Sequence, residues 1–198
     1  LFTVGLKSSP IPLEDCEGEW IVCTPENAAW FSAVLYHFGL ELHKRLRCPV
    51  GLIHSSWNGT PAESWVSWEA LEAEPLLKIL VDQMKQEDTD YPESMARYGQ
   101  ALLDWSKDAN QALDEGRCWP EVPQGPDDPN NHWREAGLFN AMVHPLIPYA
   151  IRGVTWYQGE ANAGRAYQYR TLFPLLIKDW RDHWGQGDFT FLFVQLAH

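Results

Sequence analysis

The sequence predicts an α/β domain built around a parallel sheet, on three observations. Amphipathic helical segments alternate with short apolar segments in the order helix, strand, helices, loop, strand, helix, strand. The chain has 198 residues, which is enough for one domain with a real core. The segment 189–196 is almost wholly apolar, as parallel strands buried on both faces are. We therefore expect a three-layer α/β/α arrangement around a parallel central sheet.

The first half of the chain predicts a helix over 25–46, preceded by a short strand over 21–24. Thr24 can cap the helix and Pro25 fits its first position. Apolar residues then recur at helical spacing: Phe31, Val34, Leu35, Phe38, Leu42 and Leu46. A buried strand is expected over 50–54, a polar loop over 55–60 and a new helical turn over 61–65.

The second half begins with a charged helical region over 67–115, which the pattern divides into two helices. Residues 116–135 are rich in Pro and Gly without periodicity, so we expect a functional loop. Short helical turns are expected over 137–151, where Pro145 and Pro148 limit helix length. A strand over 153–157, a helix over 163–184 and the last strand complete the prediction.

The composition of the chain argues against several classes of function. A formal net charge of -12 argues against nucleic acid as a partner, because an acidic surface repels phosphate backbones. No run approaches the roughly 18 apolar residues of a membrane span. The four cysteines, Cys16, Cys23, Cys48 and Cys118, form no C-x-x-C pair, which argues against a zinc ribbon. Cys16 and Cys23 are either a disulfide or free buried thiols, and the sequence leaves this choice open.

The tryptophan content is unusual, at 11 residues. Indole faces stack well on sugar rings, but packing in the core is the commoner use of any single tryptophan. Both interpretations stay open at this stage.

Two expected strand ends carry groups suited to chemistry. Gly59 lies in the loop that follows the strand over 50–54. A glycine there can leave its N–H free to donate to an oxyanion. An ordinary turn between the strand and the next helix explains the local pattern better. Gln158 closes the strand over 153–157 and precedes Gly159 and Glu160. A neutral amide there can donate without titrating, and an acid two residues on can orient a histidine or bind a sugar hydroxyl. Capping of the next helix is the competing interpretation.

Three blocks of sequence resemble a known family. They read Ser55-Ser56-Trp57-Asn58-Gly59-Thr60-Pro61-Ala62-Glu63-Ser64-Trp65, then Gly137-Leu138-Phe139-Asn140-Ala141-Met142, then Trp156-Tyr157-Gln158-Gly159-Glu160-Ala161-Asn162. Together they resemble the sialate O-acetylesterase branch of the SGNH hydrolase superfamily, from about Trp20 to Ala197. The resemblance implies a single flavodoxin-like α/β/α esterase domain over 1–198 that removes O-acetyl groups from sugars with a serine nucleophile. It implies no metal and no other cofactor.

The resemblance also assigns site residues. It makes the Gly59 N–H and the Gln158 amide two of three oxyanion donors, and Glu160 a partner of the catalytic histidine. Asn58 stands where a glycine is expected before Gly59. Residues around these groups are the expected sugar contacts: Trp57, Asn58, Trp156, Asn162 and Arg134.

The chain departs from the family in one large respect. We find neither the Gly-Gln-Ser-Asn-Met-like block that carries the nucleophile nor the Asp-x-x-His-like block that carries the base. Ser55 and Ser56 lie in the second block, where the family does not place its nucleophile, and a structural role is expected for His54. The chain therefore resembles the interior of the esterase domain. Our hypothesis is that it cannot turn over acetyl esters alone; steady hydrolysis of 4-nitrophenyl acetate that survives Ser55→Ala and Ser56→Ala would contradict it.

Two other classes of function remain as alternatives: a non-catalytic carbohydrate-binding module, favoured by the tryptophans and the loop over 116–135, and an inactive fragment of the esterase. A glycosidase is disfavoured because nothing sets the separation of Glu63 and Glu160. The sequence does not settle the oligomeric state, the acetylated sugar or the compartment. The resemblance is compatible with a secreted, periplasmic or lysosomal location.

Overall fold

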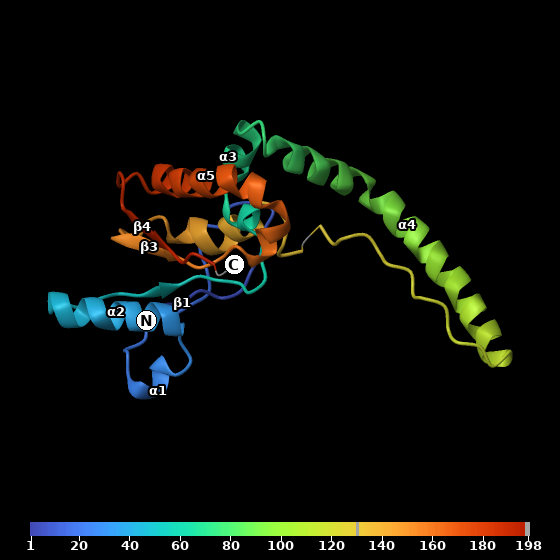
Figure 1. Ribbon diagram of the computed structural model, residues 1–198, viewed down its shortest axis with the longest axis horizontal. Coiled ribbons are helices and arrows are strands. Elements are labelled where there is room, and N and C mark those ends of the chain that lie inside the picture. The colour runs from blue at the N-terminus through green and yellow to red at the C-terminus, as the bar shows by residue number, and fades with distance from the viewer. Residues whose placement is uncertain (130, 197–198) are drawn as a thin grey trace.

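The computed structural model describes residues 1–129 and 131–196 and has a mixed α/β architecture (Figure 1). Its elements are β1 (Phe2–Thr3), α1 (Pro25–Ala28), α2 (Ala33–Leu46), β2 (Ile53–His54), η1 (Ala62–Trp65), α3 (Trp68–Ala73), α4 (Lys78–Asp114), η2 (Phe139–Val143), η3 (His144–Leu146), β3 (Gly153–Trp156), η4 (Glu160–Arg165), α5 (Ala166–Trp184) and β4 (Thr190–Phe193). The predicted α/β class is confirmed at this level.

The strands pair in parallel, as predicted, but they form two separate pairs. β1 pairs with β2, and β3 pairs with β4 in the register that places Gly153 opposite Thr190. One continuous central sheet was expected, and the described residues do not form it. The expectation that the last strand is buried is wrong: Leu192 is 46% exposed and Phe193 58% exposed. Strand side chains point to the two faces of a sheet, so the reason is that the described residues cover these faces of β4 incompletely.

The helix expected over 25–46 is interrupted. The Thr24 hydroxyl accepts from Asn27 N at 3.3 Å, so the predicted cap is confirmed, but α1 lasts one turn. Ser32 starts α2 as a second cap, accepting from Leu35 N at 3.4 Å. The break lets Phe31 pack into a small apolar cluster with Leu1 and Leu52. No strand forms over 21–24.

Where two helices were expected over 67–115, the structure has the short α3 and the long α4. α4 runs through Pro92 without ending and projects from the body as an arm (Figure 1). Residues 117–129 return along it without helix or strand, in accord with the predicted loop. Trp105 Nε1 donates to Pro120 O at 3.0 Å, which ties the returning segment to the helix. In the described parts of the chain, no helix is both long enough and apolar enough to cross a membrane.

The core lies between α5, the β3–β4 pair and the segment around η1. Trp156 stands at its centre, with the rings of Trp65, Phe173 and Trp180 at centroid distances of 6.5, 6.2 and 5.9 Å. Trp65, Trp156 and Trp180 are therefore packing residues. The four cysteines are free, and three of them are exposed, so neither the Cys16–Cys23 disulfide nor a set of buried thiols is found.

Candidate active site

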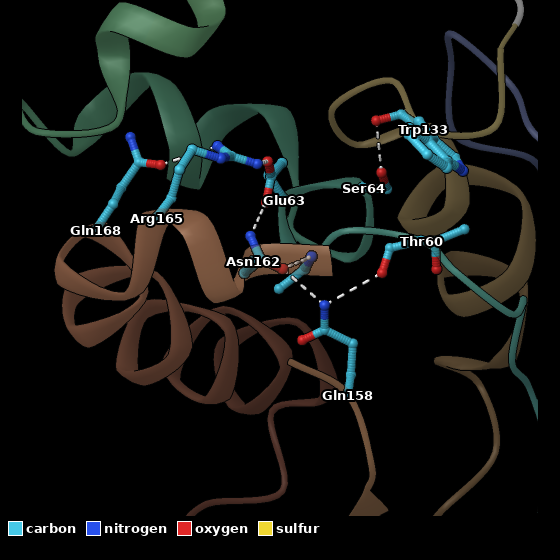
Figure 2. A network of polar contacts seen from close by, with 9 residues as sticks. Thr60, Glu63, Ser64, Trp133, Gln158, Asn162, Arg165 and Gln168 are labelled. Carbon is cyan, nitrogen blue, oxygen red and sulfur yellow. Dashed lines mark hydrogen bonds and ion pairs between the residues drawn. The ribbon is translucent and has the colours of Figure 1, made fainter. Parts of the chain in front are cut away.

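The loop after β2 and the turn after β3 lie side by side, although about 100 residues separate them in the chain. Gln158 Nε2 donates to Thr60 O at 3.1 Å, and Ala62 N donates to Asn162 Oδ1 at 2.9 Å (Figure 2). These bonds join the two segments that carry the predicted oxyanion donors. The structure thus brings the neighbourhoods of Gly59 and Gln158 together.

Gly59 occupies a conformation that favours glycine. Its φ of +76° lies in the left-handed region, where a side chain adds strain. A Cβ atom at this position would meet nothing within 4 Å, so the space beside the residue is open. The Gly59 N–H has no protein acceptor among residues 1–129 and 131–196. An open, unpaired backbone donor is what an oxyanion site needs.

Gln158 has a defined orientation. Its Nε2 donates to Thr60 O and, at 2.7 Å, to Asn162 Oδ1, while its Oε1 accepts from the Tyr169 hydroxyl at 3.0 Å. Burial raises the pKa of Tyr169, which keeps the phenol protonated as a donor. A flipped amide would set its oxygen against two acceptors, so the network selects this orientation. Both amide hydrogens are engaged, and an oxyanion would have to replace the longer bond, to Thr60 O. The donor role of Gln158 stays a prediction.

A buried carboxylate supports this arrangement. Glu63, in η1, is 2% exposed and accepts from Asn162 Nδ2 at 2.8 Å; its other oxygen pairs with Arg165 (Figure 2). From the sequence, Glu63 was part of the second block and one member of a disfavoured glycosidase pair, with no expected role in the esterase site. A glutamate amid apolar residues in a strand–loop–helix turn was the available signal, since a buried carboxylate requires partners.

Glu160 lies at the start of η4 and is exposed. No histidine among the described residues hydrogen-bonds to it, so its expected role as a histidine partner stays a prediction. Within the same residues, no group of three or more His, Cys, Asp or Glu side chains is placed to hold a metal ion.

The five expected sugar contacts separate into two groups. Trp57 and Asn58 lie beside Gly59 at the surface, and the Trp57 ring stacks on His132 at 4.4 Å between centroids. Trp156 and Asn162 are buried at 8% and 2% exposure, with protein partners of their own. Arg134 pairs with Glu87 and Asp88 on α4, and its side chain is 12% exposed. Contact of these last three with a sugar stays a prediction, and the geometry gives them structural partners.

Ser67, Asp179 and His183 have the residue types of a catalytic triad but a different order. Asp179 lies between the other two: it accepts from the Ser67 hydroxyl at 2.6 Å and Ser67 N at 2.7 Å, and its Oδ1 is 3.1 Å from His183 Nδ1. A hydrolytic triad needs the histidine next to the serine. Ser67 also caps α3 by accepting from Ala70 N, so the cluster fastens α3 to α5. The Asp179 carboxylate raises the pKa of His183 to about 8.

The chain is similar in structure and in sequence to known esterases. No family model matches it. A crystal structure of a carbohydrate acetylesterase from Xanthomonas citri superposes with a TM-score of 0.68 at 29% identity, covering 99% of this chain and 33% of the other. The fold is therefore that of part of a carbohydrate acetylesterase.

The sequence relatives are more specific. Sialate O-acetylesterases from Mus musculus and Rattus norvegicus are 36% and 34% identical to the chain over its whole length, and that from Homo sapiens is 31% identical over 90% of it. The predicted relationship is confirmed: the chain is homologous to the sialate O-acetylesterase family from end to end. It spans 36% of the length of the mouse and rat relatives and 29% of the human one.

Proposed function

We propose that this chain acts as part of a carbohydrate O-acetylesterase of the sialate 9-O-acetylesterase type, which hydrolyses acetyl esters on sugars by a serine mechanism. The observation that carries the proposal is the whole-length homology to sialate O-acetylesterases. The acetylesterase structure that superposes on 99% of the chain supports it independently. The same findings favour an esterase over a non-catalytic binding module.

We further propose that residues 1–198 are the interior part of a single SGNH-type domain with three layers. The support is that both strand pairs are parallel and that β4 leaves Leu192 and Phe193 open to pairing and packing. Further strands on these edges would join the two pairs into one sheet and bury that surface.

In this proposal the chain supplies the oxyanion side of the site. As a serine oxygen attacks the acetyl carbonyl, negative charge develops on the carbonyl oxygen, and the Gly59 N–H and Gln158 Nε2 donate to it. Glu63 and Asn162 hold the Gln158 amide in place, because they fix the acceptor of its second hydrogen. Asn58, which is exposed, and Trp57, which is half-buried, lie beside Gly59 and face the sugar. The nucleophile and the base come from segments that do not occur in residues 1–198.

A chimera tests the proposal. This chain replaces the matching segment of the mouse relative, which supplies the remaining residues, and acetate release from 9-O-acetylated sialic acid is measured. We expect hydrolysis, and a loss of about 10²–10³-fold in kcat for Gln158→Ala, the magnitude typical of one oxyanion donor. Gln168→Ala is the matched control, because this amide bonds Arg165 at the far side of the network.

A chimera that folds, as judged by its circular dichroism, and releases no acetate while the parent does would refute the proposal. A chimera that is active and indifferent to Gln158→Ala would refute the donor role alone.

A further inference from the structure

A serine and a histidine meet at the carboxyl end of β2, in a pair that the esterase proposal does not use. Ser56 Oγ lies 2.7 Å from His54 Nε2. The two residues are two positions apart along an extended segment, so their side chains leave the same face. Ser56 is exposed, so its hydroxyl is open to a reagent from solvent.

The histidine is held in the state that accepts a proton. Its ring meets the Phe31 ring edge to face at 5.5 Å, and burial lowers the pKa of His54. The imidazole is therefore neutral at pH 7. With the proton on Nδ1, Nε2 becomes the acceptor for the Ser56 hydroxyl.

Donors for an oxyanion lie in the same loop. The backbone N–H groups of Trp57, Asn58 and Gly59 donate to no protein acceptor in the described stretches 1–129 and 131–196. No protein atom crowds this turn, since a Cβ atom at Gly59 would meet nothing within 4 Å. A nucleophile, a base and unpaired donors thus occur together within residues 54–59.

We propose that Ser56, with His54 as its base, is an acetyl-accepting nucleophile of this chain, separate from the serine that the family resemblance expects. His54 Nε2 takes the hydroxyl proton while Ser56 Oγ bonds to the carbonyl carbon of an activated acetyl ester. The ester C–O bond breaks, the alcohol part leaves with the bonding electrons, and His54 returns the proton to solvent or to the leaving group. Attack by water on acetyl-Ser56 then releases acetate and restores the hydroxyl.

The reaction is slow, because no group orients the base. His54 Nδ1 has no hydrogen-bond partner among the described residues, whereas a triad places a carboxylate there. Loss of that carboxylate costs about 10⁴-fold in triad enzymes. We therefore expect acylation of one serine per chain and little turnover.

The test uses the purified 198-residue chain and 4-nitrophenyl acetate. We expect a burst of about one equivalent of 4-nitrophenolate and one added acetyl group on the peptide that contains Ser56. Ser56→Ala abolishes both, and His54→Asn slows the burst by about 10²-fold or more. Ser55→Ala is the matched control and keeps the burst, since the neighbouring Ser55 hydroxyl is donated to Met142 O at 2.8 Å.

The proposal would be overturned by no burst from the folded wild-type chain, by a burst that persists in Ser56→Ala, or by an acetyl group found only on lysines or the N-terminus. Equal burst rates for His54→Asn and wild type would also overturn it, because the base would then contribute nothing. The outcome is independent of the chimera experiment, which reports on a different serine.

Discussion

Replacing Asn162 by Ala removes the centre of the buried network that joins the two halves of the candidate site. Asn162 is 2% exposed, accepts from Ala62 N at 2.9 Å and Gln158 Nε2 at 2.7 Å, and donates to Glu63 Oε2 at 2.8 Å. The substitution leaves two donors and one carboxylate oxygen without this partner. At about 1–3 kcal/mol for each buried group left unpaired, with some relaxation, we expect a loss of about 3–6 kcal/mol. That is a large part of the stability of an ordinary domain, about 5–15 kcal/mol.

Urea unfolding followed by tryptophan fluorescence measures this loss, because Trp156 and Trp65 lie in the core beside the network. Asn110→Ala, at an exposed position of α4, is the control and is expected to change stability by less than about 0.5 kcal/mol. Asn162→Asp separates hydrogen bonding from charge. The Oδ1 atom of the aspartate still accepts both hydrogen bonds, but its second oxygen faces the Glu63 carboxylate and is repelled by it. Stability is therefore expected to recover as the pH falls and one of the two carboxyl groups is protonated. A loss under about 1 kcal/mol for Asn162→Ala would refute the view that this network holds the site together.

Three further changes test other parts of the structure. The pKa of His183 is raised from 6.5 to about 8 in the folded chain, so its protonation stabilises the fold by about 1 kcal/mol after discounting for partial exposure. This stabilisation is complete below pH 6.5 and is lost as the pH rises through 8. A pH series of unfolding free energies shows this slope, and His183→Gln abolishes it. Gly59→Ala is expected to lower the free energy of unfolding by about 1 kcal/mol, because the φ of +76° strains a residue with a side chain. Gly164 is equally open and has no positive φ, so Gly164→Ala is expected to change it little. Thermal unfolding measures both variants, and equal effects would contradict the strain argument. Pro92→Ala restores a backbone N–H inside α4 and is expected to stabilise that helix by up to about 3 kcal/mol, measured as greater protection of its amides from hydrogen exchange. Unchanged protection would show that the helix has already adapted to the proline.

The sequence predicted the features that depend on local pattern. Residue type and spacing predicted the cap at Thr24, the strand ending at His54, a strand over 153–157 and the helix ending at Trp184; the third is observed as Gly153–Trp156. The two strand ends that carry Gly59 and Gln158 were also predicted to face one site, and hydrogen bonds between their segments agree with that.

The remaining features depend on tertiary contacts. α4 passes through Pro92, although the preceding turn Asp88-Thr89-Asp90-Tyr91 has low helix propensity and the proline removes a hydrogen bond, so local propensity does not reveal one continuous helix. The apolar residues of β4 predicted burial, but burial requires a neighbour that spacing along the chain does not specify. The core position of Trp156 depends on packing against three other aromatic rings, and its contact with a sugar stays a prediction.

The arm formed by α4 has a consequence for how the chain moves through solution. A helix of 37 residues is about 55 Å long, whereas a compact globule of this chain length has a radius of gyration of about 16 Å. A rod longer than the body's own diameter adds friction without adding much mass (Figure 1). The chain is therefore expected to sediment more slowly than a sphere of 22.7 kDa, and its X-ray scattering to show a long tail of interatomic distances.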